Sequence, residues 1–156
     1  MDSGNLKTGW MEKRMFERIS ATVKVTYRLV PKEEVVSLLN HPYYKDSKAD
    51  QLPDLAEKST VFHAVTRDLS LGGMALVGDQ PFPEGSAVAI QLHLAGYPSP
   101  ITLMAEVIRT QELGGMAGVQ YRAAVKILAI NRADVTRMEK YLLVEKLKQE
   151  NAKKRP

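Results

Sequence analysis

Residues 87–107 read AVAIQLHLAGYPSPITLMAEV, two runs in which an apolar residue recurs at every second position, joined by a Gly-Tyr-Pro-Ser-Pro connection. The recurring residues are Val88, Ile90, Leu92 and Leu94 in the first run and Ile101, Leu103, Ala105 and Val107 in the second. A period of two places these side chains on one face of a β-strand, where they can be buried together. The stretch therefore predicts two successive strands, the second continuing to Thr110.

Further strands are predicted on both sides of this pair. Residues 22–29 alternate in the same way, with one face formed by Val23, Val25, Tyr27 and Leu29. Residues 61–69 are rich in β-formers, run into a tight turn at 70–73 and resume as a strand over 74–77. After the turn Leu113-Gly114-Gly115, a last strand is expected to face inward through Ala117, Val119 and Tyr121. Six or so short antiparallel strands with no interleaved helices indicate a mainly β protein, a barrel or a sandwich.

Two segments depart from the strand pattern. Residues 32–39 (KEEVVSLL) predict a short helix ending at Asn40, and the turn-like composition that follows makes residues 31–60 an insertion after the first strand. Asn131 is expected to cap a helix over 133–149, with Asp134 favourable near its positive end. The apolar stripe of that helix, Val135, Met138, Tyr141 and Leu142, could plug one end of the barrel or bind a partner or a second copy.

The predicted organisation is an N-terminal arm (1–12), a barrel (13–130), a C-terminal helix (131–150) and a basic tail (151–156). With 44% hydrophobic and 26% charged residues in 156, the composition is that of an ordinary globular domain. No apolar run is long enough to span a membrane, and the first ten residues lack a signal-peptide layout, so a cytoplasmic location is expected. The net charge of +4 favours acidic partners such as phosphates.

Several classes of site are disfavoured by the composition. The chain has no cysteine, which removes disulfides, thiolate zinc sites and cysteine nucleophiles. Its three histidines share no short spacing with one another or with a carboxylate, so no metal site and no cofactor are expected. We find no nucleophile with a plausible base and no Gly-rich phosphate loop before a helix, so an enzyme is not expected.

Two short clusters could carry function. Arg14 and Arg18 are four residues apart just before the first strand, and the run 68–73 (DLSLGG) ends a later one. An arginine fork grips phosphate oxygens or the O6/N7 edge of guanine, whereas a carboxylate accepts the N–H donors of guanine's Watson–Crick edge. Arginines plus an acceptor favour a guanine nucleotide. Taken singly, however, the arginines could be a solvated face, and Asp68 and Ser70 could simply form a turn.

In this order, flanking strands of a small barrel, the clusters resemble the motifs of the PilZ domain family. Arg14 and Arg18 match that family's RxxxR motif, and Asp68, Ser70 and Gly73 match its DxSxxG motif. The resemblance covers roughly residues 13–121 apart from the insertion, including the run RDLSLGGMALV, and a C-terminal helix is common in the family.

The resemblance implies a six-stranded antiparallel β-barrel that binds cyclic di-GMP. It implies that Arg14 and Arg18 wrap over the ligand and contact guanine bases and phosphates, and that Asp68 binds a guanine edge. Ser70 would support these contacts, and Gly73 would shape the turn, by a positive φ and a close backbone approach. Ordering of the arginine segment would then be the switch that presents a new surface to a protein partner. Motility, biofilm or polysaccharide output is usual in the family.

Some features of the site stay open at this level. Lys13 stands where some relatives carry a further arginine linked to an intercalated pair of ligands, so the expected stoichiometry is one or two. Arg109 lies near the strand end where many relatives carry an aromatic residue, and it could stack on a base or face solvent. The insertion lengthens the gap between the two motifs and could cover the site or dock a partner.

Three functions other than catalysis are compatible with these features to different degrees. The favoured one is a cyclic di-GMP receptor that relays the signal to a protein, whose identity the sequence does not give; the oligomeric state is open too. The alternative is a PilZ-like adaptor that binds no nucleotide and acts as a protein-interaction module. A single-stranded nucleic-acid binder would need exposed aromatic platforms, and only 6% of the residues are aromatic, so no nucleic-acid partner is expected.

Overall fold

The computed structural model describes residues 17–45, 60–116 and 118–154. Its strands are β1 (Ile19–Ser20), β2 (Lys24–Val30), β3 (Phe62–Leu69), β4 (Gly73–Gly78), β5 (Ala87–His93), β6 (Ile101–Leu113) and β7 (Gln120–Ile130). Its helices are α2 (Lys32–Leu39), α3 (Pro42–Lys45) and α4 (Arg132–Lys154). Arg14 and Lys13 lie outside the described residues.

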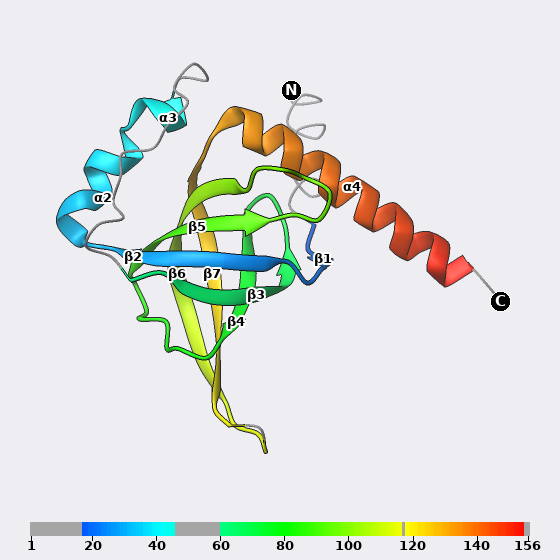
Figure 1. Cartoon of the computed structure of the whole chain (residues 1–156), viewed down its shortest axis with the longest axis horizontal. Helices are drawn as coiled ribbons and strands as arrows, with labels where there is room; N and C mark the ends of the chain where they lie inside the picture. The colour runs from blue at the N-terminus through cyan, green and yellow to red at the C-terminus, as the bar shows by residue number, and fades with distance from the viewer. Residues whose placement is uncertain (1–16, 46–59, 117, 155–156) are drawn as a thin grey trace, which may run out of the picture.

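The sheet is a closed barrel of six antiparallel strands. Its order is β3-β2-β5-β6-β7-β4, and the pairing of β4 with β3 closes the circle. The two-residue strand β1 pairs with β3 outside this circle, with Ile19 opposite Leu69 and Ser20 opposite Asp68. The predicted six-stranded barrel is confirmed, and the closure leaves few unpaired strand edges (Figure 1).

The barrel interior is filled by the alternating residues that predicted the strands. Val88, Ile90 and Leu92 of β5 and Ile101, Leu103 and Ala105 of β6 are fully buried in one core. On β2 the alternation fails at its end: Leu29, expected inside, is 37% exposed, whereas Val30 is buried. Val30 packs under α2 beside Leu38, in a second apolar cluster on the outside of the barrel, so this helix decides which residue is covered.

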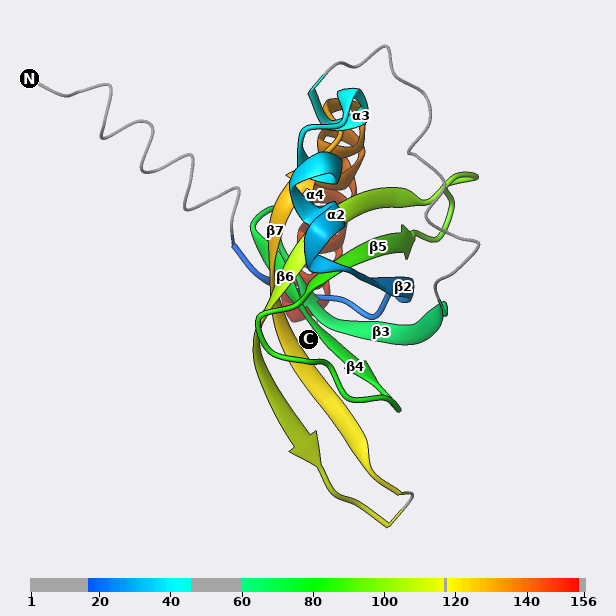
Figure 2. The ribbon, with the colours of Figure 1, turned by 90° about the vertical axis from the view of Figure 1, so that its left-hand side faces the viewer.

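The β6–β7 hairpin is longer than its buried part and projects beyond the other strands (Figure 2). Val119, predicted to face inward, is therefore 48% exposed, and Tyr121 is only partly buried against the core. Ala123 and Val125, further along β7, provide its core contacts instead. Ala117 lies outside the described residues.

The helices α2 and α3 occupy the predicted insertion and pack on the outer face of β2, β5 and β6. Leu38 of α2 shares the second apolar cluster with Ala87 and Met104 of the barrel, and Tyr44 packs against it. Tyr43 of α3 connects the insertion to the C-terminal helix, because its hydroxyl donates to Asp134 Oδ2 at 3.1 Å.

The helix α4 begins as predicted and packs against the barrel. The side-chain oxygen of Asn131 accepts a hydrogen bond from Ala133 N at 2.8 Å, which is an N-cap. Met138 and Leu142 are buried in the main core, in agreement with a helix that plugs the barrel. The helix is longer than predicted and continues to Lys154, through residues 151–154 of the expected tail, where no glycine or proline interrupts it. Within the described residues, no helix has the length and apolar character to cross a membrane.

Candidate ligand-binding site

The turn between β3 and β4 is held by Ser70, which is almost fully buried. Its Oγ accepts hydrogen bonds from the backbone N–H groups of Gly72 and Gly73, both at 3.2 Å, and donates to Gly73 O at 3.1 Å. The backbone of Ser70 also donates to Gly73 O at 2.9 Å. Ser70 therefore shapes the turn from inside.

Gly73 is required by a close approach between strands. A Cβ at this position would overlap the carbonyl oxygen of Val125 on the neighbouring strand β7. The expected positive φ is wrong, because the described glycines with positive φ are Gly85, Gly96 and Gly118. As a residue of β4 paired with Lys126, Gly73 has ordinary extended geometry, and the absence of a side chain is what matters.

Asp68 and Arg18, fifty residues apart in sequence, meet at the start of this turn. Arg18 Nη1 donates to Asp68 Oδ1 at 3.2 Å, and the same oxygen accepts from Ala75 N at 3.2 Å. A bulge lies just before Asp68, because Thr66 pairs with Leu76 and Asp68 with Ala75, which leaves Arg67 as the extra residue. Bulges of this kind redirect the side chains that follow them.

The position of Arg18 is fixed by the short strand that follows it. Thr66, fully buried, accepts a hydrogen bond from Val23 N at 2.9 Å and donates to Ala21 O at 2.6 Å. These two bonds hold the connection between β1 and β2 against β3. The segment that carries Arg18 therefore lies against β3, beside the Ser70 turn.

Two shallow depressions lie along the outer face of β7 next to Arg18. The proximal depression, about 330 Å³, adjoins the Ser70–Gly73 turn and is lined by Lys126 and Arg109 among others. The distal depression, about 420 Å³, is lined by Ala75, Gln111 and Arg122 among others. Arg18, Arg109 and Ala124 line both, so the two adjoin. We call them together the cationic trough.

The register explains how the trough is built. A second bulge leaves Ile108 as the extra residue of β6, so that Arg109 pairs with Ala124 and Gln111 with Arg122. On the other side of β7, Gly73 pairs with Lys126, Ala75 with Ala124 and Val77 with Arg122. Arg122 and Lys126 were not among the predicted site residues, although the alternation of β7 places both on its outer face. The bulge that brings Arg109 beside them has no signal in the sequence.

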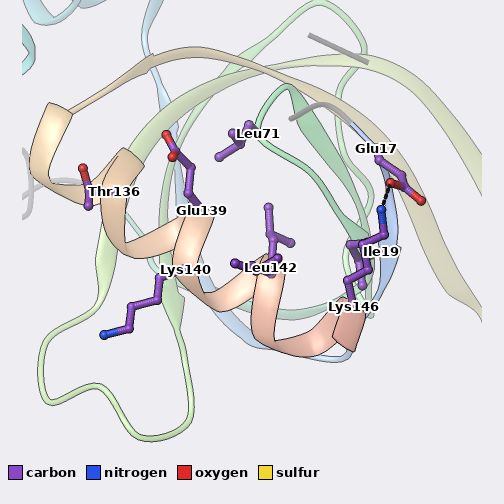
Figure 3. A pocket seen from close by; sticks show the side chains of 9 residues that line it. Glu17, Ile19, Leu71, Thr136, Glu139, Lys140, Leu142 and Lys146 are labelled. Carbon is purple, nitrogen blue, oxygen red and sulfur yellow. Dashed lines mark hydrogen bonds and ion pairs between the residues drawn. The ribbon is translucent and has the colours of Figure 1, made fainter. Parts of the chain in front are cut away.

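A third, mainly apolar groove of about 410 Å³ lies between α4 and the segment that precedes β1. Figure 3 shows Leu71 of the β3–β4 turn above Leu142 of α4, with Glu17 and Lys146 joined at one side. Lys146 Nζ donates to Glu17 Oε2 at 2.6 Å, and Gln149 Nε2 donates to Ser20 O at 2.6 Å. The residues on both sides of Arg18 are thus bound to α4.

No group of three or more histidine, aspartate or glutamate side chains among the described residues could hold a metal ion. The site is instead made of guanidinium and ammonium groups, one carboxylate and a tight turn. Such a set can bind an anionic ligand with hydrogen-bond donors on a ring edge.

The family model of the PilZ domain matches residues 48–143, which is more than half of the chain. The chain belongs to the PilZ domain family. The matched region contains Asp68, Ser70 and Gly73, whereas Arg14 and Arg18 precede it.

Solved structures share the fold of this PilZ domain. The PilZ domain of YcgR from Escherichia coli, solved with c-di-GMP, is 16% identical with a TM-score of 0.56, and the match covers 92% of this chain and 99% of that one. MrkH of K. pneumonia in its apo state is 18% identical with a TM-score of 0.60, covering 87% of this chain and 52% of that one. The Bacillus subtilis inhibitor of motility MotI/DgrA is 16% identical with a TM-score of 0.55, covering 86% and 52%. This chain therefore spans about half the length of the latter two. Comparison with curated proteins finds no match.

Proposed function

We propose that this PilZ domain is a receptor for cyclic di-GMP, which it binds without altering it, in the cytoplasm. The observation that carries the proposal is the meeting of Arg18, Asp68 and the Ser70–Gly73 turn beside a cationic trough. The ligand named for the YcgR PilZ domain supports the same choice of ligand. Cyclic di-GMP offers two phosphates for the cations and two guanine edges for the carboxylate.

The Arg18–Asp68 pair has to open for the ligand to bind. The arginine side chain is 53% exposed and the carboxylate 22%, so the pair contributes at most about 1 kcal/mol. A charge-assisted hydrogen bond to a phosphate or a guanine contributes about 1.5–3 kcal/mol. Exchange of the internal pair for ligand contacts is therefore favourable: Arg18 turns to phosphate or base, and Asp68 accepts from a guanine edge.

The other predicted site residues have distinct parts in this proposal. Ser70 and Gly73 act through the shape of the turn, which lets the ligand approach the backbone. Arg109 lines both depressions, which supports contact with the ligand over a purely solvent-facing role. Arg14 completes the RxxxR clamp, and Lys13 adds a further positive charge.

The signal would leave through α4. Glu17 and Ser20 flank Arg18 and are bound to Lys146 and Gln149, so a movement that brings Arg18 to the ligand strains both contacts. We expect ordering of the RxxxR segment and a shift of the second half of α4, which changes the surface offered to a protein partner. Amide hydrogen exchange over residues 140–150 should change when cyclic di-GMP is added. Unchanged exchange in a saturated sample would contradict the relay.

Calorimetric titration with cyclic di-GMP tests the receptor itself. Wild type should bind at micromolar or tighter concentration, and Asp68→Ala should weaken binding about a hundredfold, because guanine loses its charged acceptor. GMP serves as the ligand control, and thermal unfolding shows that the variant is folded. The stoichiometry distinguishes one bound ligand from an intercalated pair.

Absence of binding by well-folded wild type would overturn the receptor proposal. The alternative would then be the adaptor function, with α4 and the insertion as protein-docking surfaces.

A further inference from the structure

The distal depression has a composition that the RxxxR and DxSxxG motifs do not explain. Among the residues that the structure describes, it is lined by three arginines, Arg18, Arg109 and Arg122, together with neutral residues and no carboxylate. Arg122 comes from β7, and it lies outside both motifs and outside the turn they surround. Arg18 is paired with Asp68, but Arg109 and Arg122 share the hollow without an acidic partner in the described part of the chain, which is costly in the absence of an anion because like charges repel.

Arg122 has no ion-pair partner among the described residues. The ion pairs there join Arg18 to Asp68, Arg137 to Asp134, Lys146 to Glu17 and Lys148 to Glu145. Arg137 shows what a structural arginine looks like in this chain: its guanidinium donates to Asp134 Oδ1 at 2.7 Å, Ser99 O at 2.8 Å and Pro100 O at 3.0 Å. Arg122 makes no such bonds within the described chain and is exposed.

The floor of the trough allows a flat ligand to approach the sheet closely. Paired positions along the outer face of β4 and β7 carry Gly73 beside Lys126 and Ala75 beside Ala124. Gly73 lies level with Lys126, and the two alanines lie between Lys126 and Arg122, which are about 13 Å apart along the strand. A ligand with two phosphates can therefore meet one cation at each end while its rings lie over glycine and alanine.

We propose that Arg122 is a ligand-binding residue that holds a phosphate in the distal depression, with Arg109 beside it and Gln111 paired across the strands. The inference rests on the proposed function and extends it. The Asp68 turn holds one guanosine phosphate unit, and the distal depression holds the phosphate of the next. The planar guanidinium fork suits a phosphate, which it grips through two parallel bonds.

Calorimetric titration of Arg122→Ala with cyclic di-GMP tests this assignment. The dissociation constant should rise about tenfold to a hundredfold, as expected for the loss of one charge-assisted contact to phosphate. Arg122→Lys keeps the positive charge but loses the planar guanidinium fork. Its dissociation constant for cyclic di-GMP should lie between those of wild type and Arg122→Ala. Arg132→Ala is the matched control, because Arg132 is exposed at the start of α4 and lines neither depression.

Two further readouts separate ligand contact from a loss of fold. The unliganded Arg122→Ala variant should unfold at the wild-type temperature, and its affinity should depend less on ionic strength than that of wild type. If Arg122→Ala binds like wild type and Arg132→Ala, Arg122 is a solvated surface residue and the proposal is overturned, while the receptor function stands. If wild type itself does not bind, both fail.

Discussion

The two outer faces of the barrel differ in whether their polar and charged side chains have hydrogen-bond or ion-pair partners. On the face covered by α2 and α3, Asp134 accepts hydrogen bonds from Tyr43, Thr102 and Arg137, and Asn131 both caps α4 and donates to Tyr43 O. On the face that carries the cationic trough, Arg109, Arg122 and Lys126 make no ion pair within the described residues.

The difference indicates where stability and function lie. On the insertion face, Asp134 is paired with Arg137, and an apolar cluster lies between α2 and the barrel, which is what a structural surface needs. In the trough, Arg109, Arg122 and Lys126 have no ion-pair partner among the described residues, and the floor carries small side chains, which is useful when a ligand supplies the missing anions. Substitutions on the two faces should therefore separate stability from binding.

The largest effect on stability is expected at Leu38, in the apolar cluster under α2. Leu38→Ala should lower the free energy of unfolding by about 2–3 kcal/mol, because it leaves a cavity between the helix and the barrel. Denaturant unfolding measures this loss. The affinity for cyclic di-GMP should stay as in wild type, and a large loss of affinity would mean that the two faces are coupled.

Gly73→Ala should affect both properties, since Gly73 lies where the trough meets the core. The added methyl group overlaps Val125 O, so β4 and β7 must separate, at a cost of about 1–3 kcal/mol in unfolding free energy together with weaker ligand binding. Gly114→Ala is the matched control, because a Cβ there meets nothing within 4 Å. Equal thermal midpoints for the two variants would contradict the close approach.

The smallest effect is expected at Tyr43. Burial, reinforced by the nearby charge of Asp134, raises its pKa from 10.0 to about 12. The folded state therefore holds the proton more tightly than the unfolded chain, and the contribution of this group is present below pH 10 and lost as the pH rises towards 12. Tyr43→Phe should cost about 1 kcal/mol at neutral pH.

The dependence of the unfolding free energy on pH above 10 tests whether the pKa of Tyr43 is raised in the folded state. Wild type should lose more stability than Tyr43→Phe between pH 10 and pH 12, measured by denaturant unfolding at each pH. Parallel curves for the two proteins would show that Tyr43 titrates alike in the folded and unfolded states. Binding of cyclic di-GMP at neutral pH should not change in this variant.

Much of the barrel followed from local patterns, and its departures have local causes. The alternation in β5 and β6 predicted the core because each strand buries one whole face. The same rule misplaced Leu29, where a helix covers the outside of the barrel, and Val119, where the hairpin leaves it. Periodicity gives the phase of a strand but not how far its neighbours extend.

The sequence by itself determined the strand pattern, the cap at Asn131 and the two motifs, because each depends only on residues that are close together along the chain. Only the tertiary structure decided that Arg18 pairs with Asp68 and that Arg122 shares a hollow with Arg109. Both of these arrangements depend on the closure of the barrel and on the bulges at Arg67 and Ile108. A shift of one residue in register moves a side chain to the other face, and such a shift arises only when strands pair.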